Sequence, residues 1–316
     1  MIALVTGGAG FIGSHLCEYL IKKNYIVYAV DDLSTGNLNN IKHLIPNYLF
    51  HFYDASILNE HLMYMLIEKC NVIYHMAAVV GVNLVVNEPV RTITTNIKGT
   101  ENVLNIANIF KRKIFIASTS DIYGKNEKVP FTENSDCVFS STSYNRWSYS
   151  YSKAIDEYLA LAYFKNFGLP VVIARIFNTI GPKQTGKYGM VVPRFIHAAL
   201  YSKPIIIYGT GEQQRCFAYI NDVIKAIVNL MECKEACGKV FNIGTTNSIS
   251  INDLADKIKK ITNSQSQILH RNYKDAYGSD FEDIQNRIPS IDKIKDFIDY
   301  NPEMDIDIIL SRIINA

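Results

Sequence analysis

The sequence predicts an α/β fold in which a doubly wound parallel sheet carries a smaller interleaved C-terminal lobe. Three observations support this prediction. Short β-rich runs alternate with amphipathic stretches through the first half of the chain, a glycine-rich turn follows the first run, and the run Val171–Ala174 has no polar face. Alternating strands and helices are typical of right-handed βαβ crossovers, and wholly apolar strands are typical of a sheet covered on both faces.

The expected elements follow one another along the chain in this alternation. Strands of the main sheet are expected at Ile2–Val5, Ile26–Val30, Val72–His75, Lys113–Ala117 and Val171–Arg175. The helices are expected at Gly13–Lys22, Thr94–Phe110 and Tyr151–Phe167. Further along, Lys239–Gly244 is expected to return to the main sheet as a strand, and Ile251–Ile261 to form a helix capped by Ser250 or Asn252.

The regular alternation gives way after Phe177 to loops rich in Gly, Lys and Gln, at Gly181–Gly189 and Gly209–Gln214. We therefore expect two interleaved domains. Residues 1–177, with about 218–245, would form the sheet domain, and residues 178–217 with 246–316 would form the smaller lobe that binds the substrate.

The composition indicates a water-soluble globular protein of 316 residues, 48% hydrophobic, with a net charge of +2. This balance argues against nucleic acid or an anionic membrane as a partner, and no apolar run approaches the ~20 residues of a membrane helix. The six cysteines are scattered without a Cys-x-x-Cys pair, so we expect reduced thiols and a cytoplasmic location. The histidines form no cluster typical of a metal site, so we expect no metal.

A glycine motif, Gly7-x-x-Gly10-x-x-Gly13, follows the first strand and opens the first helix. In that context glycines let the backbone approach a pyrophosphate, whose charge lies at the helix N-terminus. The motif therefore predicts a Rossmann dinucleotide-binding domain, with Phe11 and Ile12 in the same turn as further cofactor-binding residues. A tight turn without a ligand is the alternative.

The second strand ends before Asp31-Asp32, about 20 residues beyond the glycines, where a carboxylate can accept hydrogen bonds from the adenosine ribose. An acid at this position repels a 2′-phosphate, so Asp31 favours NAD over NADP as the cofactor. Asp54 could bind the adenine amine, although a plain surface aspartate is an equally good interpretation.

Tyr149 and Lys153 are four residues apart and so share one face of a helix. A neighbouring ammonium favours tyrosinate, so this pair could remove a proton from a sugar hydroxyl while a hydride leaves the same carbon. A Tyr-x-x-x-Lys pair alone is a common accident of helix surfaces. Thr119, which follows the strand Lys113–Ala117 and could hydrogen-bond the reacting hydroxyl, favours the catalytic interpretation, because ligands in such sheets gather at strand carboxyl ends.

The chain resembles the extended short-chain dehydrogenase/reductases that modify nucleotide sugars. The resemblance covers nearly the whole length, and the residues that carry it are Gly7–Gly13, Asp31, His75–Ala78, Thr94–Thr100, Ser118–Gly124, Tyr149–Lys153, Ala174–Asn178, Gly209–Arg215 and Arg287–Pro289. It implies that Ala77 and Ala78 line the nicotinamide path and that Asn96 orients the cofactor or the loops around it. It also implies that Asn178, Arg215 and Arg287 hold the nucleotide diphosphate. Ser120, Val192 and Tyr208 are further expected substrate contacts.

Members of this group, as the resemblance implies, oxidise the sugar at C4 and later return the hydride. Dehydratases of the group usually carry Asp-Glu after the threonine, whereas this chain has Ser120-Asp121, which disfavours 4,6-dehydration. The Thr-Ser-acid sequence and Arg146 instead look like the UDP-glucuronate decarboxylases. Asp121 could manage protonation of the enolate, and Arg146 could bind near the sugar carboxylate, although Asp121 is one methylene shorter than the glutamate of that group.

Two other functions remain open from the sequence. A UDP-sugar 4-epimerase, acting on UDP-glucose, UDP-N-acetylglucosamine or UDP-glucuronate, would share almost all these motifs, and in it Arg146 could simply pair with a surface carboxylate. A non-catalytic NAD-binding regulator could use the same fold without turnover. The apolar faces of Lys98–Phe110 and Ala154–Phe167 are compatible with a four-helix interface, and the resemblance implies a homodimer.

Overall fold

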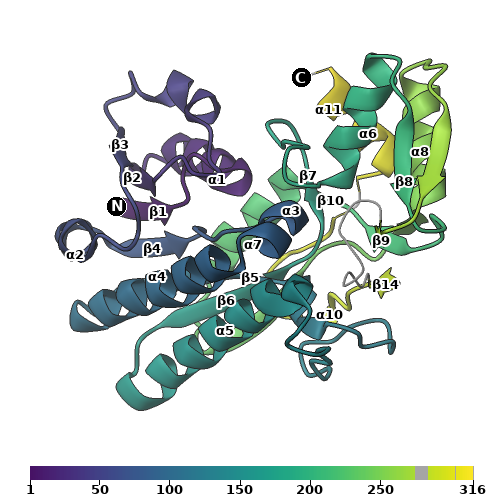
Figure 1. Ribbon diagram of the computed structural model, residues 1–316. Helices are drawn as coiled ribbons and strands as arrows, with labels where there is room; N and C mark the ends of the chain where they lie inside the picture. Colours follow the sequence, from purple (N-terminus) through teal and green to yellow (C-terminus); the bar gives the residue numbers. More distant parts are fainter. Residues whose placement is uncertain (275–283, 303, 316) are drawn as a thin grey trace.

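The computed structural model describes residues 1–274, 284–302 and 304–315, and its largest element is a seven-stranded sheet (Figure 1). The strand order is β11-β6-β5-β4-β1-β2-β3, and every neighbouring pair is parallel. The strands are β1 (Ile2–Thr6), β2 (Ile26–Asp31), β3 (Phe50–Asp54), β4 (Val72–His75), β5 (Lys113–Thr119), β6 (Val171–Ile176) and β11 (Lys239–Ile243). The chain therefore runs outward from β1 in both directions, and the strand order reverses between β1 and β4, where such sheets bind their ligands.

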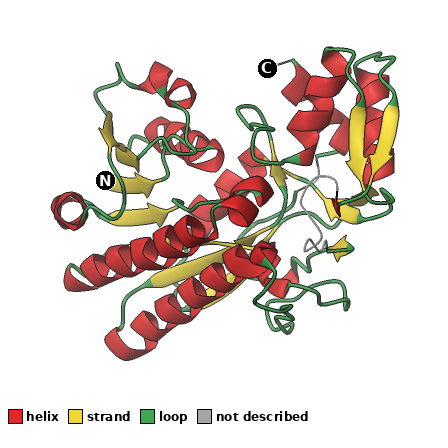
Figure 2. Cartoon of the chain, in the orientation of Figure 1, coloured by secondary structure: helices red, strands yellow, loops and turns green. Residues whose placement is uncertain are grey.

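Helices cover both faces of this sheet, as Figure 2 shows, and a separate apolar core lies on each face. One core includes residues of α1 (Phe11–Lys22) and α7 (Ile220–Glu232), and the other includes residues of α2 (Glu60–Lys69), α4 (Pro89–Ile109) and α5 (Ser148–Phe167). Along β1, Ala3 and Val5 belong to the first core and Leu4 to the second, because successive side chains of a strand point to opposite faces. This explains why the strands read as continuous apolar runs.

The expected strands and helices are present, but one strand of the main sheet was not expected and several elements begin or end at other residues. β3 was not among the expected strands. Among the described residues it pairs with β2 alone, and its alternation of buried Phe50 with exposed His51 belongs to a sheet edge. α4 begins five residues before Thr94, with a proline in its first turn, a position that proline favours. α5 begins at Ser148 rather than Tyr151, so Tyr149 lies within the helix. β11 pairs with β6, as expected for Lys239–Gly244.

Three small sheets lie apart from the main sheet, near the carboxyl ends of its strands (Figure 1). They pair β7 (Thr179–Ile180) with β10 (Ala218–Tyr219), β8 (Ile205–Tyr208) with β13 (Ile268–Arg271), and β9 (Gln214–Cys216) with both β12 (Ser248–Ser250) and β14 (Asn286–Arg287). The accompanying helices are α6 (Val191–Leu200), α8 (Ile251–Ile261), α10 (Asp292–Lys295) and α11 (Ile306–Ile314). Of the two expected caps of α8, Ser250 accepts the hydrogen bond from the Asp253 amide.

Shorter helices connect these elements: α3 (Val82–Asn87) follows β4, and 3₁₀ turns lie at Leu38–Asn40, Lys42–Leu44, Ser120–Tyr123 and Asn145–Trp147. Residues 275–283, 303 and 316 of the expected C-terminal lobe lie outside the described residues. Within the described ranges, no helix has both the length and the hydropathy needed to cross a bilayer.

Candidate active site

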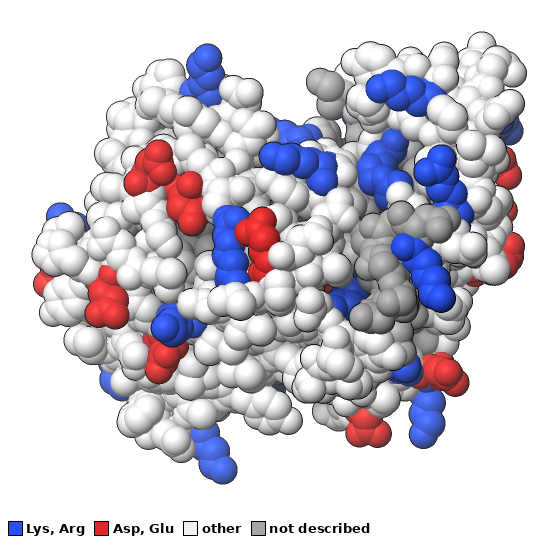
Figure 3. All heavy atoms as spheres, in the orientation of Figure 1, with Lys and Arg blue, Asp and Glu red and all other residues white. Residues whose placement is uncertain are grey.

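A cavity of about 510 Å³ lies at the carboxyl ends of the main-sheet strands. Figure 3 shows the molecule hollowed between the part that holds β1–β3 and the part that holds α6 and α8, with Lys and Arg side chains gathered around the hollow. All but three of the site residues expected from the sequence line the cavity: Gly7, Gly10, Phe11, Ile12, Gly13, Asp31, Ala77, Ala78, Thr119, Ser120, Asp121, Arg146, Tyr149, Asn178, Val192, Tyr208, Arg215 and Arg287. The exceptions are Asp54, Asn96 and Lys153.

The glycine turn between β1 and α1 forms one end of the cavity. Gly7 has a φ of +69°, and a Cβ on Gly13 would lie 2.0 Å from the carbonyl oxygen of Gly7, so neither position accepts a side chain without a shift of the backbone. Gly10 precedes α1, and no side chain caps the first turn of that helix. Helix amides without an internal partner therefore meet the cavity where a pyrophosphate would lie, and the turn fits a dinucleotide.

The carboxylate of Asp31 is held at the rim of this turn. Its Oδ2 accepts a hydrogen bond from the Ala9 amide at 3.0 Å, and its Oδ1 accepts one from the Leu33 amide at 2.9 Å. Burial raises the pKa of Asp31, although these amides oppose the rise. The Gly10 amide also hydrogen-bonds this carboxylate. A carboxylate offers about four lone-pair positions, so Asp31 can still accept a hydrogen bond from a ribose hydroxyl.

Asp54 ends the edge strand β3, is exposed and does not line the cavity. Ala55 and Ile57 line it at this point instead. The structure thus places the carboxylate expected near the adenine amine outside the lining, because its position at the end of an edge strand leaves it open to solvent.

Helix α5 carries Tyr149 into the cavity beside the end of β5. The phenol hydrogen-bonds the Thr119 hydroxyl, and Tyr149 is 8% exposed. Burial raises the pKa of Tyr149, and the nearby Asp121 carboxylate raises it further. A proton-accepting phenol in this setting needs a positive charge close by.

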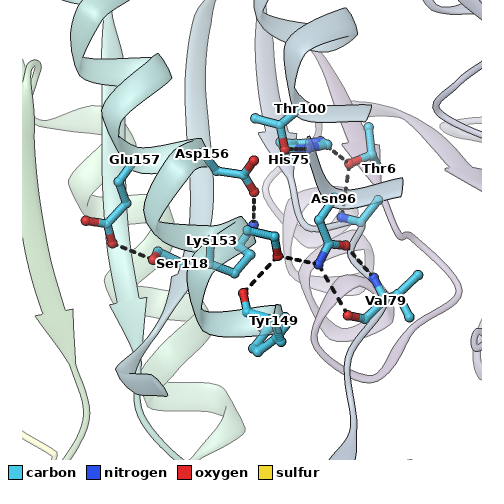
Figure 4. Close-up of polar contacts among 12 residues, drawn as sticks. Thr6, His75, Val79, Asn96, Thr100, Ser118, Tyr149, Lys153, Asp156 and Glu157 are labelled. Atoms are coloured by element: carbon cyan, nitrogen blue, oxygen red, sulfur yellow. Dashed lines mark hydrogen bonds and ion pairs between the residues drawn. The ribbon is translucent and has the colours of Figure 1, made fainter. Parts of the chain in front are cut away.

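Lys153 lies one turn along α5 from Tyr149 but does not line the cavity. It is 1% exposed, and its ammonium donates a hydrogen bond to Oδ2 of Asp156 at 2.8 Å (Figure 4). This partner was not predicted from the sequence. An acid three residues after a lysine is a frequent pattern on exposed helix faces, so nothing in the pattern indicates a buried ion pair.

Asn96 contributes to the site indirectly. Its side-chain oxygen accepts a hydrogen bond from the Val79 amide at 2.8 Å, and its Nδ2 donates to the Ser152 hydroxyl at 3.1 Å (Figure 4). Asn96 therefore joins α4, the loop after β4 and α5. Asn96 does not line the cavity. Its hydrogen bonds fit the role of orienting the surrounding loops, which the resemblance implies.

His75 lies at the centre of a buried polar chain. Its Nδ1 is 2.8 Å from the Thr6 hydroxyl, its Nε2 is 3.1 Å from the Thr100 hydroxyl, and the Thr6 hydroxyl accepts a hydrogen bond from the Ala77 amide (Figure 4). Burial lowers the pKa of His75 to about 3, so the imidazole is neutral. These hydrogen bonds join β1, β4 and α4 behind the cavity.

Asp121 lies between two arginines in the wall of the cavity. Arg146, which is 3% exposed, places Nη1 at 3.2 Å from Oδ2 of Asp121, and Arg287 forms an ion pair with Oδ1. Burial by itself would raise the pKa of Asp121, but Arg287 and Arg146 outweigh burial and hold that pKa below its usual range. Three charged side chains with a net positive charge can bind an anionic group of a ligand.

The far end of the cavity brings together residues from the small sheets and α6. Asn178, Val192, Tyr208 and Arg215 were expected there. Further lining residues, which the sequence analysis did not name, are Tyr188, Arg194, Gln213 and Tyr273. The Arg194 guanidinium lies 5.0 Å from the centre of the Tyr208 ring, and Gln213 donates a hydrogen bond to the Tyr273 hydroxyl at 3.1 Å. Tyr188, Arg194 and Tyr273 belong to none of the motifs named from the sequence, so only the tertiary fold places them together.

Metal-ligating side chains do not cluster in the described part of the chain: no group of three or more His, Cys, Asp or Glu residues could hold an ion there. All six cysteines are free thiols.

Comparison with known proteins identifies a family and several proteins to which this chain is similar. Residues 4–313 match the protein family described as GDP-mannose 4,6 dehydratase. A UDP-N-acetyl-alpha-D-glucosaminuronate decarboxylase of Bacillus cytotoxicus is 39% identical over 302 residues, which cover 95% of this chain and 92% of that protein. UDP-glucuronic acid decarboxylase 1 of Xenopus tropicalis is 32% identical, with 99% of this chain and 71% of that protein covered.

Among solved structures, the UDP-glucuronic acid 4-epimerase of Bacillus cereus, in complex with UDP-glucuronic acid and NAD, is similar with a TM-score of 0.90 and 31% identity. The match covers 100% of this chain and 98% of that chain. In all these comparisons the similarity extends over nearly the whole of the present chain.

Proposed function

Because this chain belongs to the GDP-mannose 4,6-dehydratase family of extended short-chain dehydrogenase/reductases, we propose that it decarboxylates a UDP-linked uronic acid. The family resemblance expected from the sequence is confirmed, and the chain is an NAD-dependent enzyme that modifies a nucleotide sugar. A non-catalytic regulator is therefore not supported.

The observation that carries the proposal is the position of Asp121 between Arg146 and Arg287, in the same cavity as Tyr149. A guanidinium group suits a carboxylate better than a neutral hydroxyl. A sugar whose reacting carbon faces Tyr149 would present its C5 carboxylate to this cluster. Relatives that act on UDP-linked uronic acids support the same substrate class.

The glycine turn and Asp31 would hold NAD, with Ala77 and Ala78 along the nicotinamide path. When bound, NAD supplies hydride acceptance from the sugar and hydride return to it. The protein's own part in this exchange is to move a proton. Tyr149 removes the proton from the C4 hydroxyl, Thr119 holds that hydroxyl through its own hydrogen bond, and Lys153 stabilises the phenolate.

With C4 as a ketone, the substrate is a β-keto acid. The bond between C5 and the carboxylate breaks, its electron pair moves toward the C4 oxygen, and CO2 leaves. One proton from solvent then reaches C5, so each turnover consumes a proton. The two arginines keep Asp121 ionised, which makes it a poor proton donor. We therefore propose that Asp121 orients Arg146 and Arg287 and accepts a hydrogen bond from the water that brings this proton.

The nucleotide would occupy the part of the cavity that is lined by Arg215, Asn178, Val192 and Tyr208. Arg215 supplies positive charge for the diphosphate. Ser120 lies at the sugar end, directly before Asp121. In this proposal residues 1–177, with about 218–245, bind the cofactor, and residues 178–217 with 246–316 bind the nucleotide sugar.

A homodimer is part of the proposal. The helices α4 and α5 lie side by side and expose several large apolar side chains: Val90, Ile93, Ile109, Ile155, Tyr158, Phe164 and Phe167 (Figure 1). Two copies of this pair would form a four-helix interface that covers part of this apolar surface, including Tyr158.

Incubation of the enzyme and NAD with UDP-glucuronate, UDP-N-acetylglucosaminuronate and UDP-glucose, followed by mass spectrometry and NMR, tests the reaction. We expect a uronic acid substrate to lose the mass of CO2. A product of unchanged mass and inverted C4 would replace the proposal with the 4-epimerase. Tyr149→Phe should abolish conversion, by about 10²-fold or more, while NAD binding is kept.

A further inference from the structure

The buried carboxylate of Asp156 is a charged group close to Tyr149 and Lys153 to which the reaction above assigns no role. Asp156 is 0% exposed, and its Oδ2 lies 2.8 Å from the Lys153 ammonium. We propose that Asp156 is a positioning residue of the Tyr149–Lys153 pair, whose carboxylate fixes the ammonium in the protein interior and offsets its charge beside the phenol. This inference rests on the proposed proton-transfer role of Tyr149.

A buried ammonium requires a counter-charge, because its desolvation costs several kcal/mol. The other two buried carboxylates near α5 already pair with arginines: Asp121 with Arg146 and Arg287, and Glu157 with Arg175 at 2.9 Å. Asp156 therefore compensates Lys153 at this place in the fold. It also fixes where the ammonium lies, since Asp156 and Lys153 are one turn apart on a rigid helix.

Asp156 is itself held by a neighbouring helix. The Thr100 hydroxyl of α4 hydrogen-bonds its carboxylate and also lies 3.1 Å from Nε2 of His75. Through His75 and Thr6, the carboxylate belongs to a polar chain that reaches the end of β1, where the glycine turn begins (Figure 4). The position of the Lys153 ammonium is thus coupled to the strand that precedes the cofactor cradle.

The consequence for the phenol is electrostatic. The Asp156 carboxylate is among the groups that raise the pKa of Tyr149. An ammonium on the same helix would lower that pKa, so pairing Lys153 with Asp156 would moderate the acidity of the phenol. α4 presents the uncharged Asn96 and Thr100 to this region. The charged or titratable groups on the other surrounding elements are His75 on β4, Asp121 after β5, Arg146 before α5, Glu157 on α5 and Arg175 on β6. Substitution of Asp156 leaves all the ion pairs among these groups in place.

The test is the ionisation of Tyr149 in the NAD-bound enzyme, measured from tyrosinate absorbance after subtraction of a Tyr149→Phe spectrum in each background. Asp156→Asn keeps the shape and the hydrogen-bond acceptor but removes the charge. We expect Tyr149 to ionise about one pH unit lower in Asp156→Asn than in the wild type. The rising limb of the pH profile of sugar conversion should move to lower pH by the same amount, because the phenolate is the form that accepts the proton.

Asp222→Asn is the control, because Asp222 is a partly buried carboxylate in a helix on the opposite face of the sheet. It should leave the Tyr149 titration unchanged. A titration curve of Asp156→Asn that superimposes on the wild-type curve would overturn the proposal and leave Asp156 with a packing role only. The titration requires no turnover, so it remains informative if no uronic acid is decarboxylated.

A second pair of variants covers the case in which Asp156→Asn does not fold. Lys153→Met should lower the melting temperature, because it leaves the Asp156 carboxylate buried without its counter-charge. Adding Asp156→Asn to Lys153→Met should then recover part of that loss. If the double variant melts no higher than Lys153→Met alone, Asp156 is not the counter-charge of Lys153.

Discussion

Arg146 and Asp121, 25 residues apart in the chain, form a buried ion pair in which Nη1 lies 3.2 Å from Oδ2. Arg146 comes from the 3₁₀ turn before α5, and Asp121 from the turn after β5. The pair therefore joins the two segments that deliver Tyr149 and Thr119, and it places both a carboxylate and a guanidinium near the reacting phenol. The first two predictions each replace one residue of this pair.

Arg146→Gln should weaken the use of a uronic acid more than the use of a neutral sugar. Loss of a charge-assisted hydrogen bond costs about 1.5–3 kcal/mol, so we expect kcat/KM for UDP-glucuronate or UDP-N-acetylglucosaminuronate to fall roughly 10- to 100-fold. Binding of UDP-glucose, measured by calorimetry, should change little. Arg146→Lys, which keeps the charge but loses the planar fork, should lie between the two. Equal losses for charged and neutral sugars would contradict carboxylate recognition by Arg146.

Asp121→Asn should destabilise the protein in a pH-dependent manner. The arginines hold the pKa of Asp121 below its unfolded value of about 3.9, so the stability it contributes is present above that pH and is lost as pH falls through the lower folded value. At pH 7 the variant leaves two guanidinium groups uncompensated, and we expect a loss of roughly 3 kcal/mol.

Thermal unfolding of wild type and Asp121→Asn from pH 7 down to pH 3 measures this difference, which should shrink below about pH 4. Asp307→Asn is the control, because it removes an ion pair to Lys257 that is exposed and contributes little. A difference between wild type and Asp121→Asn that stays constant across the whole range would show that the charge of Asp121 is not what stabilises the fold.

Gly13→Ala should disrupt the cofactor cradle. The added Cβ would lie 2.0 Å from the Gly7 carbonyl oxygen, so the turn must shift, at a cost of about 1–3 kcal/mol. We expect the rise in melting temperature that NAD produces in the wild type to disappear. Gly168→Ala separates this clash from backbone strain, because Gly168 has a φ of +66° but open space around its Cβ position. That control should lose roughly 1 kcal/mol and keep its response to NAD.

Tyr158→Asp should separate the proposed homodimer. Tyr158 lies on α5 and is 78% exposed, and a carboxylate in a covered apolar interface would be desolvated without a partner. Light scattering should report a dimer for the wild type and a monomer for the variant. Tyr48→Asp changes a residue that is 84% exposed and lies before β3, so it should remain dimeric. A wild-type monomer at micromolar concentration would remove the dimer from the proposal.

Much of the fold was predictable because its signals are local. The apolar runs of β1, β4 and β6 specify strands covered on both faces, and the glycine spacing specifies a turn in which Gly7 and Gly13 leave no room for a side chain. The carboxyl ends of parallel strands meet at one edge, so Thr119 and Tyr149 could be placed near the glycine turn before any coordinates were known. Element ends were less accurate: α5 begins three residues before the expected Tyr151, because Ser148 can open a helix that the apolar pattern enters only later.

The sequence by itself determined the doubly wound sheet, the cofactor turn and the identity of the Tyr-Lys pair, because each depends on residues within a few positions of one another. Only the tertiary structure decided the partners of the charged groups: Asp156 for Lys153, and two arginines for Asp121. It also decided that Asp54 lies outside the cavity lining. The physical reason is that the energy of a buried charge depends on which distant segments exclude water from it, and the order of residues along the chain does not encode that distance directly.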